Sequence, residues 1–305
     1  MRIHDDLTTE GFDMPPVAPG TGPLPGQGFL SAWNTHLGAG ATMVIVEDET
    51  ALLGLVETQE AFEFAGSGSV TDYHTPLGEG AADLLATFVA DVAGRKPIRF
   101  DSLPLEAADV VAAGLQRAGM TPETRQHEAA PVLDLPASYD EYLADLGKKA
   151  RHESRRKRRR FETALGPPRL ERLDGEEAVS AFAAMHRRSH GTKGAFMDDA
   201  KEAFFGGLHE QAGGLVDALF GDDGMPAAMA FGFEDADTYY FYNSAYEPAW
   251  RDHSPGMVLI EMVIRHAIAQ GLDRLDLLKG DEDYKIRLGA VARPLFEVST
   301  AGGAA

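Results

Sequence analysis

Residues 238–289 read TYYFYNSAYEPAWRDHSPGMVLIEMVIRHAIAQGLDRLDLLKGDEDYKIRLG. Aromatic residues bounded by turn formers predict a strand at Thr238–Tyr242. Met257–Ala269 is too long for a single strand and contains neither Gly nor Pro. Its acid Glu261 and base Arg265 stand four residues apart, which is the spacing of neighbours on a helix face. The segment is therefore predicted to be a helix.

Two further signals complete this unit. Gly271 follows the predicted helix and supplies the left-handed residue that commonly ends one. Arg274–Leu278 then forms a second short apolar run, which predicts another strand. A strand, a loop, a helix and a strand in this order predict one right-handed βαβ crossover.

The loop before the predicted helix has the composition of an anion site. Ser254 suits the N-cap, Pro255 suits the first helical position, and Gly256 allows a ligand to approach the backbone closely. The first turn of a helix leaves N–H groups unpaired and carries roughly half a positive charge. Arg251 adds a cation beside them. The loop is therefore predicted to bind a phosphate or pyrophosphate.

These residues resemble a known family. Arg251-x-x-Ser254-x-Gly256 resembles the Q/R-x-x-G-x-G/A pyrophosphate loop of the GNAT superfamily of N-acyltransferases, with Ser254 in place of the first glycine. Gly280-Asp281-x-x-Tyr284-Lys285, Thr71-Asp72-Tyr73 and the basic segment 148–160 resemble the CelD-like acetyltransferases. That branch is named for cellulose-biosynthesis loci and is related to the Fem peptidoglycan-bridge transferases. The resemblance implies acyl-CoA, for example acetyl-CoA, as co-substrate.

The order of predicted elements indicates the fold class. Both halves of the chain alternate strands and helices, and the second half follows GNAT order. We expect an α/β (α+β) protein with two GNAT-like domains in tandem, each a mixed twisted sheet flanked by helices. The N-terminal domain, residues 1–130, has no match to the pyrophosphate loop. The C-terminal domain, residues 131–305, holds the acyltransferase and ends with a last strand at Leu295–Val298.

Composition narrows the class of protein. The chain has 305 residues, 44% of them hydrophobic, and a net charge of −20. This length and composition are enough for packed cores, and the negative charge disfavours general adhesion to nucleic acids or membranes. There are no cysteines, so disulfides, thiolate metal sites and a cysteine nucleophile are excluded. The polar N-terminal residues and the lack of a long apolar run predict a cytoplasmic protein. Histidines lack metal spacing, so no metal is expected.

One segment has the opposite charge to the rest of the chain. Residues 148–160 contain nine Lys or Arg and one acid, Glu153, within a helical segment that is predicted to span Tyr139–Arg160. A solvated helix whose arginines pair with the protein's many acids explains this composition. An anion-binding helix explains it equally, because clustered arginines make bidentate phosphate contacts.

The predicted chemistry is direct transfer of an acyl group from a thioester to an amine. An alkyl ammonium has a pKa near 10, so a base must remove a proton, and Asp281 or Glu282 is the candidate. Tyr284 is the candidate that supplies a proton or hydrogen bond to the leaving thiolate, and a place in the core explains this tyrosine equally well. Lys285 is the candidate that binds an acceptor carboxylate or holds the acyl donor. His190, before a Gly-rich loop, is interpreted as a surface histidine without a role.

The donor is expected to lie along the predicted strand and helix. Backbone N–H groups beside the strand that ends in Tyr242 and Asn243 would polarise the thioester carbonyl. The candidate donor-binding residues are Tyr242, Asn243, Arg251, Ser254, Gly256 and Met257. The acceptor is expected to be an amine on a small metabolite or a cell-envelope precursor.

Two other functions stay open. An aminoacyl transferase that uses charged tRNA, as the Fem relatives do, would explain the basic segment and the altered loop. A non-catalytic protein that kept the fold would explain the altered loop alone, although Arg251 and Gly256 count against it. Fold does not fix function, so the site must discriminate between these possibilities.

Overall fold

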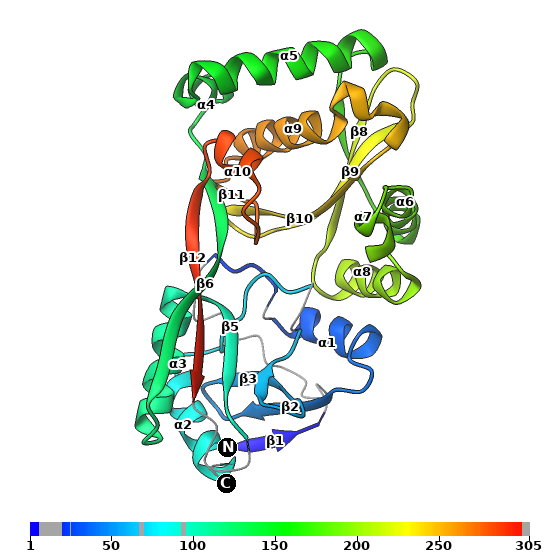
Figure 1. Cartoon of the computed structure of the whole chain (residues 1–305). Coiled ribbons are helices and arrows are strands. Elements are labelled where there is room, and N and C mark those ends of the chain that lie inside the picture. The colour runs from blue at the N-terminus through cyan, green and yellow to red at the C-terminus, as the bar shows by residue number, and fades with distance from the viewer. Residues whose placement is uncertain (6–19, 25, 67–69, 93–95, 301–305) are drawn as a thin grey trace. The chain divides into compact units, whose positions relative to one another are not determined.

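The computed structural model describes residues 1–5, 20–24, 26–66, 70–92 and 96–300. The chain divides into two compact units (Figure 1). The N-terminal unit comprises Met1–Ala130 and the residues from Arg293 onward, and the C-terminal unit comprises Pro131–Ala292. The C-terminal unit is thus inserted, in sequence, before the last strand of the N-terminal unit.

The N-terminal unit contains a four-stranded antiparallel sheet in sequential order. Its strands are rich in β-branched and large apolar residues, as expected of strands. The central pair places Val46 opposite Leu53 and Val44 opposite Leu55. The strands are β1 (Arg2–His4), β2 (Thr42–Glu47), β3 (Leu52–Glu57) and β4 (Phe62–Phe64).

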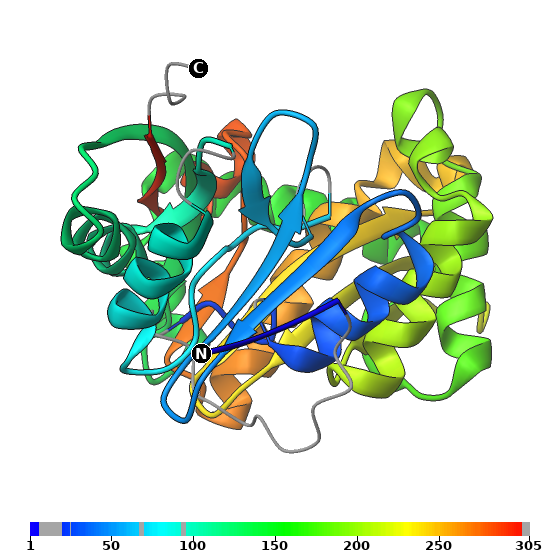
Figure 2. The same cartoon turned by 90° about the horizontal axis from the view of Figure 1, so that it is seen from below.

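Helices cover both faces of this sheet, as Figure 2 shows. Leu53 and Leu55 of β3 belong to a core shared with α2 (Ala81–Val92) and α3 (Leu105–Arg117). The residue between them, Gly54, faces Leu30 of α1 (Gln27–His36). Because successive residues of a strand point to opposite faces, α1 lies on the face opposite to α2 and α3.

The last strand corrects the sequence-based assignment. Leu295–Val298 was expected to close the C-terminal domain, but β12 (Val291–Thr300) pairs antiparallel with β5 (Arg99–Pro104) of the N-terminal unit. Val298 and Phe100 join the core of α2 and α3, so burial in that core fixes the strand there. A short apolar strand carries no signal of its partner, because pairing depends on distant residues.

The C-terminal unit is built on a mixed sheet, which confirms the predicted α/β fold class. β11 (Arg274–Asp276) is parallel to β10 (Thr238–Tyr246), and the other pairs in this unit are antiparallel. The order runs from the end of β6 (Pro122–Asp134) through β11, β10, β9 and β8 to β7. The remaining strands are β7 (Arg169–Leu173), β8 (Leu215–Phe220) and β9 (Pro226–Glu234).

The two faces of this sheet pack against different helices. Ala228 and Ala230 of β9 leave room for α9 (Pro255–Gln270), whose apolar stripe fills one core. Phe231 and Phe233 point to the other face. There Phe231 packs against α6 (Glu176–Arg187) and α8 (Asp199–Gln211) through their phenylalanines. The predicted crossover is therefore confirmed, with α9 linking the parallel strands β10 and β11.

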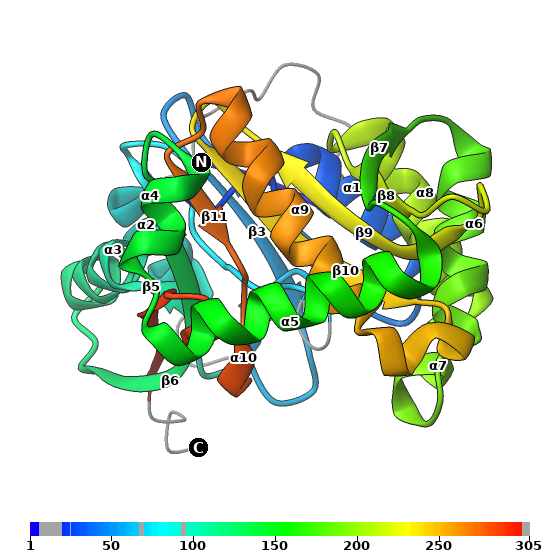
Figure 3. The ribbon, with the colours of Figure 1, turned by 90° about the horizontal axis from the view of Figure 1, so that it is seen from above.

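The predicted helical segment Tyr139–Arg160 is two helices. α4 (Tyr139–Asp145) ends at Leu146, whose extended backbone turns the chain into α5 (Lys148–Leu165). Leu146 is buried with Tyr142 in the α9 core, so tertiary burial outweighs helix continuation here. Figure 3 shows α5 crossing over α9. Glu261 of α9 accepts hydrogen bonds from Ser154 (3.2 Å) and Arg158 (2.9 Å) of α5.

Three short helical segments complete the C-terminal unit. They are α7 (Thr192–Phe196), the 3₁₀ turn η1 (Pro248–His253) and α10 (Asp283–Arg287). Across the described residues, no helix combines the length and apolar composition needed to cross a bilayer.

Candidate functional site

The parallel strands β10 and β11 separate where the predicted thioester site lies. Their register ends at Tyr240 opposite Asp276, whereas β10 continues to Tyr246. Leu278 follows in a left-handed conformation, φ 55°, and its N–H donates to the Asp276 carboxylate at 2.8 Å. The Asp276 side chain therefore takes over the hydrogen bonding that a longer β11 would have provided. The predicted strand Arg274–Leu278 is shortened for this reason.

Asn243 lies on the part of β10 that β11 does not accompany. Its Oδ1 accepts the Ser244 N–H at 2.7 Å and lies 3.1 Å from Nε2 of His186. Because Oδ1 is an acceptor, His186 Nε2 is the donor, which fixes the tautomer of a ring that is only 1% exposed. Sequence reasoning considered the exposed His190 and missed His186. The signal was its place on the apolar face of α6.

Tyr242 serves the core rather than an open site. Its ring contacts Phe205, Phe231 and Phe233, with centroid separations of 5.6, 6.3 and 5.4 Å. These contacts place the side chain on the α6/α8 face of the sheet. Tyr242 can therefore contribute only its backbone, next to Asn243, to a donor site.

The turn before α9 differs from the predicted cap. Ser254 is the N-cap residue, but it is left-handed, φ 57°, and its side chain makes no capping hydrogen bond. The N–H groups of Met257 and Val258 both donate to its carbonyl, and Pro255 has no N–H. Among the described residues, Gly256 is the member of this turn whose N–H has no backbone acceptor. The turn offers an anion one N–H instead of the predicted set.

The surroundings of this turn are open on one side. A Cβ on Gly256 would meet only Tyr246, at an ordinary contact distance of 3.5 Å. Arg251 is exposed, and within the described chain its side chain has no ion pair. Arg160 of α5 donates to the Asp252 carbonyl at 2.9 Å, so the basic helix is tied to this loop.

Lys285 has a structural role that the sequence did not predict. It is 3% exposed, and its Nζ donates to the carbonyls of Leu278 (3.0 Å) and Lys279 (2.7 Å). Its third contact is the Glu282 carboxylate at 3.1 Å. An ammonium has three donors, so none is left for an acceptor carboxylate or an acyl donor. Gly280, beside this ion pair, has φ 130°, a backbone conformation that residues other than glycine rarely adopt.

The two candidate bases are on the surface. Asp281 and Glu282 are both exposed, and Glu282 is held by Lys285. Asp281 has no ion pair within the part of the chain that the structure describes. Of the two, Asp281 is the carboxylate that can move and accept a proton.

Tyr284 lies on α10 and is largely withdrawn from solvent. Burial, with a smaller contribution from the Glu282 carboxylate, raises the pKa of its hydroxyl to about 12. The hydroxyl therefore keeps its proton at neutral pH. It packs against the α9 core and lines the cavity described next.

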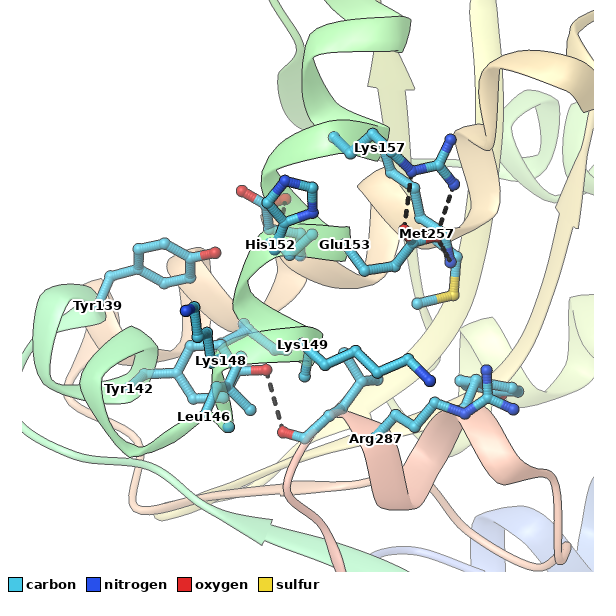
Figure 4. A pocket seen from close by; sticks show the side chains of 18 residues that line it. Tyr139, Tyr142, Leu146, Lys148, Lys149, His152, Glu153, Lys157, Met257 and Arg287 are labelled. Atoms are coloured by element: carbon cyan, nitrogen blue, oxygen red, sulfur yellow. Dashed lines mark hydrogen bonds and ion pairs between the residues drawn. The ribbon is translucent and has the colours of Figure 1, made fainter.

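A cavity of about 1460 Å³ lies between α4, α5, α9 and α10 (Figure 4). Tyr142, Leu146, Ile264, Tyr284 and Leu288 supply apolar wall, and the Tyr142 hydroxyl donates to the Leu288 carbonyl at 3.0 Å. Pockets that bind drug-sized ligands measure roughly 300–1,000 Å³, so this cavity is large enough for such a ligand.

The wall of this cavity is cationic. Lys148, Lys149, Arg156 and Lys157 reach it from α5 and Arg287 from α10, against the two carboxylates of Glu153 and Glu261. Figure 4 shows Lys149 and Arg287 extending into the cavity from different walls. No group of three His, Cys, Asp or Glu side chains among the described residues is arranged to hold a metal ion.

A comparison with protein families fits this geometry. Residues 148–286 match the Acetyltransferase (GNAT) domain. The GNAT match begins at α5 and ends in α10, so it contains the diverging strands and most of the cavity wall. No curated protein matches the chain.

Solved structures show the same fold at low sequence identity. A conserved protein of unknown function from Bacteroides thetaiotaomicron VPI-5482 has a TM-score of 0.63 and 13% identity, and the alignment covers 92% of this chain and 91% of that one. FemX has a TM-score of 0.63 at 12% identity, with 95% and 94% covered. L-PGS from Bacillus licheniformis has a TM-score of 0.64 at 13% identity, with 91% and 92% covered. These similarities establish the fold alone.

The structure brings only some of the predicted site residues to one place. Tyr284 and Met257 line the cavity with the basic helix. The others lie at the β10 edge, at the turn before α9, or in the turn before α10, outside the residues that line the cavity: Tyr242, Asn243, Arg251, Ser254, Gly256, Asp281, Glu282 and Lys285. Tyr139 and Tyr142 of α4 were missed, although aromatic residues just before a basic segment are a visible signal.

Proposed function

We propose that the C-terminal unit is an N-acyltransferase that moves an acyl group from acyl-CoA to an amine by direct attack. The observation that carries this proposal is the position of Tyr284. Within the GNAT match, Tyr284 lies on the wall of a cavity that combines apolar surface with cations. A thioester with a charged carrier needs both kinds of wall. The motif from Gly280 to Lys285 contains Tyr284 and resembles the CelD-like branch, so we assign the proposed enzyme to that branch.

The pKa of Tyr284 defines its role. A thiol titrates near 8.5, far below about 12, so full proton transfer from Tyr284 to the thiolate is uphill. A hydrogen bond from the hydroxyl to the developing thiolate is favourable, and hydrogen bonds to charged groups are the stronger kind. Tyr284 therefore stabilises the leaving group as a hydrogen-bond donor and retains its proton.

The other steps use the backbone and the surface. The β10 backbone beyond Tyr240 polarises the thioester carbonyl, because β11 no longer accompanies it there. The neutral amine forms the new C–N bond while the C–S bond breaks and the thiolate leaves. The proton of the ammonium passes through water to Asp281, the exposed carboxylate that no ion pair holds within the described chain.

The basic face of α5 supports a second class of donor substrate, an aminoacyl-tRNA. The basic face of α5 would suit the 3′ end of an aminoacyl-tRNA, whose reactive ester is also attacked by an amine. The net charge of −20 opposes a large RNA over most of the surface. We therefore place the acyl-CoA reaction first.

The deciding experiment measures donor use. Purified protein is incubated with acetyl-CoA and a panel of small amines and amino sugars, and free thiol is followed over time. Amine-dependent thiol release supports the proposal. Absence of release, together with aminoacyl transfer from charged tRNA to the same panel, would replace it with the second donor class.

A further inference from the structure

The cavity in the C-terminal unit is lined by two cations, Lys148 and Lys149, that no acid of the described chain neutralises. Of the other three lining cations, Arg156 and Lys157 pair with Glu153 and Arg287 pairs with Asp283, in a chain whose net charge is −20. Like charges gathered on one wall repel each other, and this repulsion is strongest where solvent is partly excluded. Such a wall is stabilised by a ligand with fixed negative charge.

The lining carboxylates Glu153 and Glu261 are already paired, Glu153 with Arg156 and Lys157 of the cavity wall and Glu261 with cations outside it. Glu153 accepts from Arg156 at 2.8 and 2.7 Å, and Arg156 holds its pKa at about 2. Glu261 pairs with Arg158 at 2.9 Å and Arg265 at 3.2 Å, neither of which lines the cavity. In the part of the chain that the structure describes, Lys148 and Lys149 have no ion pair. Their charge is available to a ligand.

The same two lysines open α5, an 18-residue helix. Its N-cap, Gly147, provides no side-chain hydrogen bond, and its first turn contains no acid. Within the described residues, the N–H groups of Lys148, Lys149 and Ala150 have no acceptor. Lysines are unfavourable at the positive end of a helix, so Lys148 and Lys149 destabilise the first turn of α5. Gly147, both lysines and Ala150 all line the cavity.

The turn before α9 offers less. It presents one N–H, that of Gly256, while the first turn of α5 presents three beside two lysines. Arg287 adds a guanidinium from α10, held by Asp283 at 2.9 Å with its side chain 70% exposed. Guanidinium and ammonium groups are the usual phosphate ligands in proteins. The balance of donors favours the α5 end of the cavity.

We infer that Lys148, Lys149 and Arg287, with the free N–H groups of the first turn of α5, bind the phosphate groups of the donor substrate. The inference rests on the proposed function for the identity of that donor as a phosphate-bearing thioester. It moves the phosphate site from the turn at Ser254, outside the cavity lining, to the first turn of α5 on the cavity wall. The apolar wall around Tyr284 and Ile264 then receives the uncharged arm that carries the thioester.

The test compares two pairs of cations on one helix. Lys148→Ala/Lys149→Ala removes the cavity pair, and Arg155→Ala/Arg159→Ala removes two exposed cations that lie outside the cavity lining. Titration calorimetry with coenzyme A, pantetheine and inorganic pyrophosphate measures binding. The lysine variant should bind coenzyme A and pyrophosphate about ten- to a hundredfold more weakly, the range for charged hydrogen bonds, with pantetheine unchanged. The arginine variant should change binding less than about threefold.

A third variant separates binding from folding. Gly147 has φ −55°, and a Cβ there would meet nothing within 4 Å, so Gly147→Asp is sterically free. Aspartate is a preferred N-cap, so this variant should melt at the same or a higher temperature. Its carboxylate occupies the same N–H groups and repels phosphate, so coenzyme A binding should fall. A variant that melts at the same or a higher temperature and yet binds coenzyme A more weakly has lost a ligand contact and not its fold.

The outcomes distinguish the site from the reaction. Equal weakening by the lysine and arginine pairs, or a larger loss from Arg251→Ala than from the lysine pair, would overturn the phosphate site. If acetyl-CoA is turned over with unchanged KM in the lysine variant, the reaction stands and the site fails. If pyrophosphate binding depends on the lysines but no amine releases thiol from acetyl-CoA, the site stands and the proposed donor fails.

Discussion

The proposed reaction depends on a single hydroxyl group, that of Tyr284. We expect Tyr284→Phe to lower kcat by about ten- to a hundredfold, because a hydrogen bond to a charged leaving group is lost only in the transition state. The ring remains on the α9 core, so donor affinity should not change. Steady-state kinetics with calorimetric donor binding measures both quantities. An unchanged kcat would assign Tyr284 to packing alone.

Asp281 belongs to the same scale. We expect Asp281→Asn to alter the low-pH limb of the rate profile, because amide nitrogen cannot accept the proton of the ammonium. The side chain is exposed, so the fold should be unaffected. Rates between about pH 5 and 10, with Glu282→Gln as the matched control, measure the effect. A shift only in the Glu282 variant would transfer the role to that residue.

Single residues also mark the limit of sequence reasoning. Tyr284 was found from its motif and lies on the cavity wall. Lys285 came from the same motif, yet its ammonium is used up by two carbonyls and Glu282. The left-handed Ser254 could not be foreseen, because serine prefers an extended backbone at a helix N-cap. Burial and backbone strain come from distant contacts that a motif does not contain.

At the scale of elements, local sequence signals predicted those helices, strands and turns whose formation depends on neighbouring residues. The antiparallel strands β8 and β9 are joined by a turn at residues 221–225, whose Gly and Asp residues are typical of a hairpin turn. The crossover β10–α9–β11 was confirmed because its C-cap glycine, Gly271, and its apolar periodicity are local signals. The break between α4 and α5 was not predicted, since the burial of Leu146 that turns the chain is tertiary.

Strands β7, β8 and β9 are joined by a polar network. Arg172 donates to Asp217 at 2.9 and 3.0 Å and to Glu234 at 2.6 and 3.0 Å. The Tyr239 hydroxyl donates to Asp217 at 2.8 Å. Asp217 is fully buried, so its charge needs these partners. Because Tyr239 belongs to β10, the network links four neighbouring strands, β7 to β10.

Glu234 makes this network sensitive to acid. His266 and Arg172 hold its pKa at about 2, below the ordinary 4.5. A depressed pKa means stability that is complete above 4.5 and is lost as pH falls toward 2. We expect Glu234→Gln to cost roughly 1 kcal/mol at pH 7 and to match the wild type near pH 2.

Urea unfolding at several pH values measures this effect. Glu210→Gln is the control, because this exposed acid of α8 has no ion pair in the described chain. A difference between wild type and Glu234→Gln that stays constant from neutral pH to pH 2 would show that the carboxylate charge contributes nothing to the network.

At the scale of the molecule, the sign of the surface charge decides which large partners are admitted. The chain carries −20 overall, while α5 exposes basic residues that include Arg155, Arg156 and Arg159. We expect no specific tRNA binding at about 150 mM salt, because repulsion from the acidic surface opposes attraction to this single helix. Filter binding with charged and uncharged tRNA measures this, and Arg155, Arg156 and Arg159 changed to Glu is the control variant. Sub-micromolar affinity for an aminoacyl-tRNA that this variant abolishes would promote the tRNA-dependent reaction.

The pairing of β12 with β5 has a consequence for the order in which the chain folds as it is synthesised. Ile98 and Thr300 are hydrogen-bonded across 202 residues, and the whole GNAT match is translated between them. A nascent chain emerges N-terminus first, so β5 leaves the ribosome long before its partner strand exists. The C-terminal unit can be complete while the N-terminal unit still exposes an unpaired strand edge. An unpaired strand edge can pair with other chains and cause aggregation. Synthesis of β12 ends this exposure, because β12 then pairs with β5.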